Sequence, residues 1–176
     1  MRVYGSAAET APAATDSPAD DGDGQTVRVG IAELRTAEGR DHLRSSGFGS
    51  CVGVALYDLE AGVGGLAHVM LPEAGDPDRP AKYADTAVPA LVDALRERGA
   101  TDLRAKLAGG SDMFEFSSTD ESVGERNVAA VEAELGRLGI PVVGRDVGGD
   151  HGRSLDLDVA TGELLVASAA DGNRTL

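Results

Sequence analysis

The fold depends on the stretch Gly47-Phe48-Gly49-Ser50-Cys51-Val52-Gly53-Val54-Ala55-Leu56-Tyr57-Asp58, which contains the only cysteine of the chain. After the cysteine, Val52, Val54 and Leu56 alternate with mostly small residues, which predicts a β-strand whose small-residue face neighbouring backbone can approach closely. Gly47 and Gly49 allow the preceding chain to turn sharply, and such a turn brings backbone N–H groups near the Cys51 sulfur. The sequence therefore predicts a turn, then the cysteine, then an apolar strand.

A second apolar run, Gly64-Gly65-Leu66-Ala67-His68-Val69-Met70-Leu71-Pro72, is also typical of a strand. The short stretch 58–62 between the two runs favours a hairpin that sets the His68 imidazole beside the Cys51 thiol, an arrangement that makes a cysteine nucleophilic. The structural alternative is that Cys51 is a small buried hydrophobe and His68 an ordinary core residue. Because glycines destabilise a strand, their presence around Cys51 favours the functional interpretation.

Composition limits the partners of the chain. The formal net charge is −14, from 30 acidic and 16 basic residues. Such a surface repels nucleic-acid phosphates and anionic membranes, so we expect no nucleic-acid partner and no membrane insertion; it is typical of a halophile's cytoplasm. The sequence has no apolar run of membrane-spanning length and no signal-peptide pattern. A single cysteine forms no internal disulfide, which favours a reducing, cytoplasmic location.

The 176 residues suffice for one domain with a sizeable core. Residues 1–25 are rich in alanine, aspartate, glycine, proline and serine, and predict a disordered acidic leader. Residues 26–168 form the predicted domain, and residues 169–176 a frayed polar C-terminal tail.

Two helices are predicted among about seven strands. The helices cover 83–98, where Pro89 predicts a kink or a late start, and about 122–138, where Ser122 and Glu125 have capping-box spacing. Besides the two runs above, strands are predicted at 26–34, 103–108, 140–143, 155–159 and 164–166, with a polar connection at 36–44. This mixed order argues for an α/β layered sandwich of mixed β-sheet with helices packed outside, and not for a doubly wound sheet.

Six segments together resemble the chemoreceptor glutamine deamidase family, CheD, in order and spacing, and the acidic composition resembles a halophilic archaeal member. The segments are GFGSCVGVALYD, GGLAHVMLP, KYADTAV, KLAGGSDMF, GERNVAAVEAEL and GGDHGRSLDLDVATGELLV, and the match as a whole runs from about residue 27 to residue 166. The resemblance implies a layered sandwich, similar also to the deamidase domain of cytotoxic necrotising factor. It further implies an amidohydrolase that converts glutamine side chains on chemoreceptor cytoplasmic domains to glutamate and ammonia.

The resemblance also implies site residues. Cys51 would attack the amide carbon to form a thioester, and His68 would transfer the protons. Ser45 stands where the family has a threonine as third member; it keeps the hydroxyl but lacks the methyl group that restricts χ1. Backbone N–H groups around Gly49 and Ser50 are candidates for oxyanion stabilisation. This chemistry needs no metal or organic cofactor, and the spacing of the three histidines suits no metal.

Two other functions stay open. Gly47-x-Gly49 after a polar segment is compatible with a phosphate-binding module, but a strand and not a helix follows, so the anion-binding helix terminus is missing. The second is a non-catalytic adaptor: the resemblance implies binding to the chemotaxis phosphatase CheC, and a protein kept for that contact alone would not need Cys51. Thiol reactivity distinguishes the two roles. The segments 124–127 and 148–153 are candidates either for the substrate cleft or for structural roles.

Overall fold

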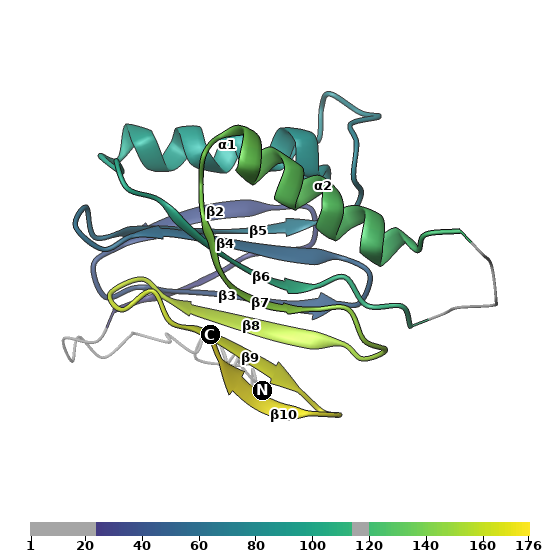
Figure 1. Cartoon of the computed structure of the whole chain (residues 1–176). Coiled ribbons are helices and arrows are strands. Elements are labelled where there is room, and N and C mark those ends of the chain that lie inside the picture. The colour runs from purple at the N-terminus through teal and green to yellow at the C-terminus, as the bar shows by residue number, and fades with distance from the viewer. Residues whose placement is uncertain (1–23, 114–119) are drawn as a thin grey trace, which may run out of the picture.

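The computed structural model describes residues 24–113 and 120–176 (Figure 1). Two five-stranded sheets stack face to face, and both helices lie on the outer face of one of them (Figure 1). The predicted α/β layered sandwich with helices outside is confirmed. Nearly all of the predicted leader, and the aromatic residues Phe114 and Phe116, lie outside the described residues. Neither helix in the described ranges has the length and hydropathy needed to cross a membrane.

Each sheet mixes one parallel pair with antiparallel neighbours. The first sheet has the order β1-β3-β8-β9-β10 and the second β2-β5-β4-β6-β7. The parallel pairs are β1–β3 and β6–β7. The elements are β1 (Thr26–Arg28), β2 (Leu34–Glu38), β3 (His42–Phe48), β4 (Val52–Asp58), β5 (Val63–Val69), η1 (Pro80–Lys82), α1 (Ala84–Glu97), β6 (Arg104–Gly109), α2 (Val123–Arg137), β7 (Val142–Val147), β8 (Arg153–Asp158), β9 (Leu164–Ser168) and β10 (Gly172–Thr175).

The predicted hairpin exists as the antiparallel pair β4–β5 at the centre of the second sheet. Every residue of both strands is buried, because the helices cover one face of this sheet and the first sheet covers the other. The small-residue face of β4 looks toward the first sheet. A Cβ atom at Gly53 would overlap the Leu155 side chain of β8, so the close approach of the sheets depends on this glycine.

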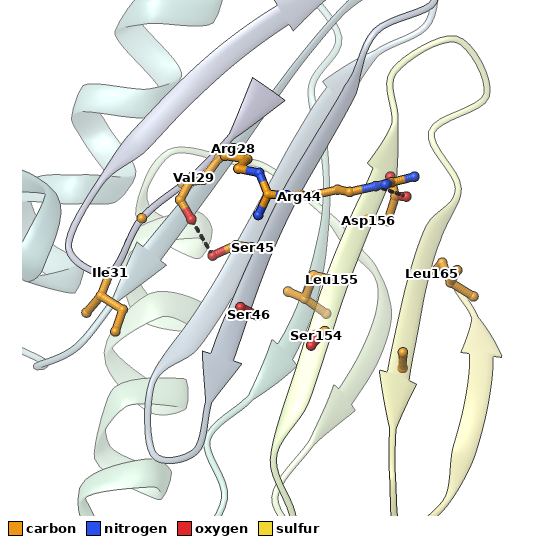
Figure 2. Close-up of a pocket in the computed structure, with 12 residues that line it drawn as sticks. Arg28, Val29, Ile31, Arg44, Ser45, Ser46, Ser154, Leu155, Asp156 and Leu165 are labelled. Atoms are coloured by element: carbon orange, nitrogen blue, oxygen red, sulfur yellow. Dashed lines mark hydrogen bonds and ion pairs between the residues drawn. The ribbon is translucent and has the colours of Figure 1, made fainter. Parts of the chain in front are cut away.

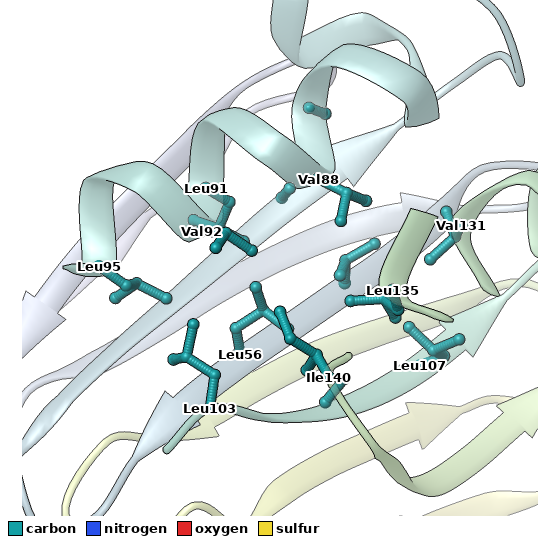
Figure 3. Close-up of a cluster of buried hydrophobic side chains, with 14 of the residues drawn as sticks. Leu56, Val88, Leu91, Val92, Leu95, Leu103, Leu107, Val131, Leu135 and Ile140 are labelled. Atoms are coloured by element: carbon teal, nitrogen blue, oxygen red, sulfur yellow. The ribbon is translucent and has the colours of Figure 1, made fainter. Parts of the chain in front are cut away.

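The main core lies between the two helices and the second sheet (Figure 3). The predicted apolar face of the first helix is confirmed, since Val88, Leu91 and Leu95 are fully buried. The helix begins at Ala84, so the late start considered for Pro89 does not occur. The predicted capping box of the second helix is also present: Ser122 Oγ accepts from the Glu125 N–H at 3.1 Å, and Glu125 Oε2 accepts from the Ser122 N–H at 3.0 Å.

Two predictions near the N-terminus are wrong. The predicted strand 26–34 is divided: β1 ends at Arg28, and the chain then crosses to the other sheet through a turn in which Ala32 has a φ of 58°. The predicted polar connection 36–44 contains most of β2 and the start of β3. These strands carry few apolar residues because β2 is an edge strand and no helix covers the outer face of β3.

The C-terminal tail is not frayed as predicted. β10 pairs with β9, and Leu176 beyond it exchanges two backbone hydrogen bonds with Leu164, at 3.2 and 2.9 Å. Lys106 Nζ also donates to the Leu176 carbonyl oxygen at 2.8 Å and to that of Gly162 at 2.6 Å. Backbone pairing needs no apolar side chain, so the polar composition of this segment gave no signal of it.

Candidate active site

Cys51 and His68 lie on neighbouring strands at the same end of the β4–β5 hairpin. The ladder pairs Gly53 with His68 and ends at the pair Val52–Val69, one residue after Cys51. Because side chains alternate across a sheet, Cys51 and His68 project from the same face, toward the first sheet, as diagonal neighbours. Diagonal neighbours have backbones about 7–8 Å apart, within reach of a histidine. Among the hydrogen bonds of the described residues, none joins the two side chains directly.

Ser45 of β3 reaches across from the first sheet and fixes the protonation of His68. Ser45 Oγ donates to the carbonyl oxygen of Val29 at 2.7 Å and lies 2.9 Å from His68 Nδ1 (the Val29 contact is drawn in Figure 2). A serine hydroxyl has one hydrogen and a carbonyl oxygen only accepts, so Ser45 must accept the second bond from His68 Nδ1–H. The unprotonated nitrogen of the neutral ring is therefore Nε2.

His68 is a buried neutral base. Its side chain is fully buried, and its ring stacks on Phe48 with 4.0 Å between the ring centroids and 19° between the planes. Burial lowers the pKa of His68 to about 4 from its ordinary value of 6.5, so the imidazole is uncharged at neutral pH. Nε2 is buried and has no hydrogen-bond partner among the described residues. A lone pair kept unpaired in this way is available to accept a proton.

Cys51 is half-buried, and its resting form is the thiol. Burial raises the pKa of the thiol above its ordinary value, and the N–H of Cys51 itself, which lowers this pKa, offsets only part of the effect. A low thiol pKa is therefore not the source of reactivity in this arrangement. A thiolate forms when the proton moves to a base, and His68 is the buried base on the same face of the sheet.

Backbone contacts fix the turn before Cys51. Gly47 has a φ of 86°, in the region that favours glycine. The Gly49 N–H donates to the Gly47 carbonyl at 3.2 Å, and the carbonyls of Gly49 and Cys51 accept from the N–H groups of Ser111 and Gly110, both at 2.8 Å. In the described part of the chain, the N–H groups of Ser50 and Cys51 donate to no other residue. These two groups are the turn's free candidates for oxyanion stabilisation.

Asn127, in the first half of α2, also contacts the site. From the sequence, segment 124–127 is a candidate either for the substrate cleft or for a structural role. Its Nδ2 donates to the carbonyl oxygens of Ser50 and Met70, both at 2.9 Å. Asn127 is fully buried. The helix comes this close because Gly124 has no side chain: a Cβ atom there would lie 2.5 Å from the Gly110 carbonyl oxygen.

Comparison with known proteins identifies the family of this chain. Residues 70–168 match the family model described as CheD chemotactic sensory transduction. The chain belongs to the CheD family. The resemblance found in the six sequence segments is confirmed by this match.

Curated relatives extend the similarity over nearly the whole chain. The "Probable chemoreceptor glutamine deamidase CheD" of Haloarcula marismortui is 46% identical over 166 residues, covering 92% of this chain and 95% of the relative. That of Natronomonas pharaonis is 44% identical over 163 residues, covering 90% and 96%. The "Chemoreceptor glutamine deamidase CheD" of Bacillus licheniformis is 46% identical over 158 residues, covering 85% and 94%. The two haloarchaeal relatives agree with the acidic composition.

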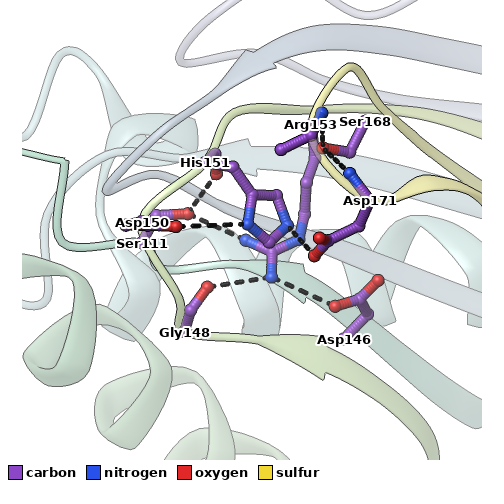
Figure 4. Close-up of polar contacts among 9 residues, drawn as sticks. Ser111, Asp146, Gly148, Asp150, His151, Arg153, Ser168 and Asp171 are labelled. Carbon is purple, nitrogen blue, oxygen red and sulfur yellow. Dashed lines mark hydrogen bonds and ion pairs between the residues drawn. The ribbon is translucent and has the colours of Figure 1, made fainter.

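The segment 148–153 of this CheD family member takes part in a cluster of polar contacts around Arg153 (Figure 4). Arg153 is buried; it donates to Ser111 Oγ at 2.8 Å, to the Gly148 carbonyl at 2.8 Å and to Asp146 Oδ1 at 3.1 Å. Ser111 Oγ donates in turn to the His151 carbonyl at 2.6 Å. The Ser111 N–H donates to the Gly49 carbonyl in the turn before Cys51. These hydrogen bonds therefore connect the turn to β7 and β8 and restrict its motion.

A pocket of about 500 Å³ lies on the outer face of the first sheet (Figure 2). Its lining comprises Arg28, Val29, Gly30, Ile31, Arg44, Ser45, Ser46, Ser154, Leu155, Asp156, Leu165 and Ala167. Neither Cys51 nor His68 lines it, so it does not lead to the thiol. Its connection to the site is through Ser45, which binds His68 Nδ1, and through Val29, whose carbonyl oxygen accepts from Ser45.

Proposed function

We propose that this chain is a chemoreceptor glutamine deamidase, the activity in the names of its CheD relatives. It hydrolyses the side-chain amide of glutamine on chemoreceptor cytoplasmic domains to glutamate and ammonia. The observation that carries the proposal is the protonation of His68. Ser45 holds Nδ1–H, which leaves the Nε2 lone pair unpaired on the face of the sheet that also carries Cys51.

The first half of the reaction uses Cys51 and His68. The Cys51 proton moves to His68 Nε2, and the thiolate attacks the amide carbon. The N–H groups of Ser50 and Cys51 stabilise the negative charge that develops on the amide oxygen. The tetrahedral intermediate then loses ammonia as His68 Nε2–H protonates the leaving nitrogen, and a Cys51 thioester remains.

Hydrolysis of the thioester regenerates the enzyme. His68 Nε2, neutral again, takes a proton from water as the water attacks the thioester carbon. The carbon–sulfur bond breaks, glutamate leaves, and the proton on Nε2 returns to the Cys51 sulfur. Throughout, Ser45 keeps the ring oriented and Nδ1 protonated, and it exchanges no proton with the substrate.

The wider setting follows from the same proposal. A lone thiol that must stay reduced suits the cytoplasm, where the proposed receptor domains lie. The phosphatase CheC, which the sequence resemblance implies, is a further proposed partner. If binding CheC were the chain's only role, a Cys51→Ala variant would keep all of its function.

The test is incubation with a purified chemoreceptor cytoplasmic domain. We expect ammonia release and an amide-to-acid mass change at specific glutamines, detected by peptide mass spectrometry. Cys51→Ala removes the sulfur with little change in volume, so it should fold with an unchanged melting temperature and release no ammonia. Deamidation that persists in Cys51→Ala would refute the cysteine mechanism.

A further inference from the structure

The β4–β5 ladder continues past its last backbone pair through a side chain. The last pair is Val52–Val69, and the next residue of β5's chain, Met70, turns its N–H to the Lys82 carbonyl at 2.9 Å. Asn127 Nδ2 takes the place of the missing rung. Its two hydrogens bind the Ser50 carbonyl on the cysteine side and the Met70 carbonyl on the histidine side, both at 2.9 Å.

The same contact sets the direction of the Cys51 N–H. The Ser50 carbonyl and the Cys51 N–H belong to one peptide group, and the described residues contain no cis peptide bond. In a trans peptide these two groups point in opposite directions. Because Asn127 draws the carbonyl toward α2, the N–H points away from α2. This N–H and the sulfur belong to the same residue, and the N–H lowers the pKa of the thiol.

Packing does not explain the residue. Asn127 Oδ1 is buried and has no hydrogen-bond partner among the described residues. An unpaired buried oxygen destabilises the folded state, and an apolar residue would fill the space without that cost. What the asparagine supplies and an apolar residue lacks is the pair of donors on Nδ2.

We propose that Asn127 is a positioning residue for the reaction: its single amide group holds the strand of the nucleophile to the strand of the base and orients the Cys51 N–H. This inference rests on the proposed deamidase function. The helix position is well fixed for the task, since Gly124, one turn earlier, packs directly on the Gly110 carbonyl.

The test compares Asn127→Asp with Val131→Ala. Aspartate has the shape of asparagine, but its carboxylate has no hydrogen to donate to the two carbonyls. Val131 is fully buried one turn further along α2 and cannot hydrogen-bond to the site, so its truncation controls for lost stability. We expect kcat of Asn127→Asp to fall by about 10–100-fold with KM changed much less, because misplacement acts on the transition state. Val131→Ala should keep the kcat of the unaltered chain.

A second measurement needs no substrate. The rate of Cys51 alkylation by iodoacetamide, followed against pH, should have a higher midpoint in Asn127→Ala, which removes both donors without placing a charge near the sulfur, because the N–H is no longer held beside the sulfur. Val131→Ala should leave the midpoint in place. If Asn127→Asp does not fold, kcat is also measured on Asn127→Ala.

The outcomes separate the two proposals. Equal kcat and equal alkylation midpoints in the Asn127 and Val131 variants would overturn the positioning role. Absence of deamidation by the unaltered chain would overturn the proposed function alone, and the alkylation comparison would still decide whether Asn127 orients Cys51.

Discussion

The proton on His68 is placed by a serine that has one hydrogen to give. Ser45 uses that hydrogen on the Val29 carbonyl, so its remaining contact with His68 accepts the proton of Nδ1. The sequence pointed to Cys51 and His68 through the hairpin and to Ser45 through the family resemblance. It gave no sign of Val29, because the crossing that brings this carbonyl to Ser45 lies inside a stretch predicted as one strand.

Substitutions at Ser45 test this arrangement. Ser45→Ala leaves Nδ1–H and the Val29 carbonyl without a buried partner, so we expect the free energy of unfolding to fall by about 1–3 kcal/mol. The loss of ring orientation should lower kcat by up to about 100-fold. Ser45→Thr keeps the hydroxyl and narrows the rotamer choice, so its kcat should equal or exceed that of the serine. Deamidation rates and denaturant unfolding of the three proteins measure this; an alanine variant as fast as the serine would remove Ser45 from the site.

The buried neutral state of His68 predicts a dependence of stability on pH. Its pKa is about 4 in the folded chain and 6.5 ordinarily, so between these values the unfolded chain binds a proton that the folded chain does not. Stability should therefore fall as pH is lowered from 6.5 to 4, by about 3 kcal/mol for this group. Burial raises the pKa of Asp58, but several backbone N–H bonds together outweigh it and hold this pKa below 3.8, so the contribution of Asp58 to stability is lost below this window.

Unfolding by denaturant across that window, for the unaltered chain and for His68→Gln, isolates the effect. The difference in free energy of unfolding between the two proteins should shrink as pH falls, because glutamine does not titrate. A difference that stays constant with pH would show that His68 is not held neutral.

The sequence pattern predicted those helices and strands whose formation depends on burying side chains. The hairpin β4–β5 and the helices α1 and α2 carry continuous or periodic apolar residues because both faces, or one full stripe, are covered. β2 and β10 escaped prediction because edge strands are held by backbone hydrogen bonds, which leave no trace in the side chains. Asn127 shows the same limit in the site: its neighbours Ser50 and Met70 are brought to it only by the stacking of α2 on the sheet.

The small face of β4 carries a prediction of its own. A methyl group at Gly53 would overlap Leu155 and lie 3.2 Å from the ring of Phe48, the residue stacked on His68. Gly53→Ala should therefore lower the free energy of unfolding by about 1–3 kcal/mol and reduce deamidation. Gly152→Ala is the matched control, since nothing lies within 4 Å of its added methyl group; its stability should change by less than about 0.5 kcal/mol. Similar thermal unfolding of the two variants would mean that the sheets can move apart at β4.

For the whole molecule, net charge decides how stability responds to salt. The formal charge of −14 leaves many acidic groups without a basic partner, and several of the ion pairs of the described residues have both side chains exposed, where an ion pair stabilises little. Compaction therefore works against repulsion among acids. Screening shortens the reach of that repulsion, from about 10 Å at 0.1 M salt to about 3 Å at 1 M.

We therefore expect the melting temperature to rise steeply with potassium chloride up to about 1 M and then to level off as screening saturates. The shape of the curve separates two causes. Screening of charges saturates, whereas strengthening of apolar burial by excluded salts keeps increasing with concentration. Replacing exposed acids that form no ion pair among the described residues, such as Asp93 or Glu97, by neutral amides should reduce the rise only if repulsion causes it. A melting temperature that is the same at low and molar salt would show that the acidic surface does not oppose folding.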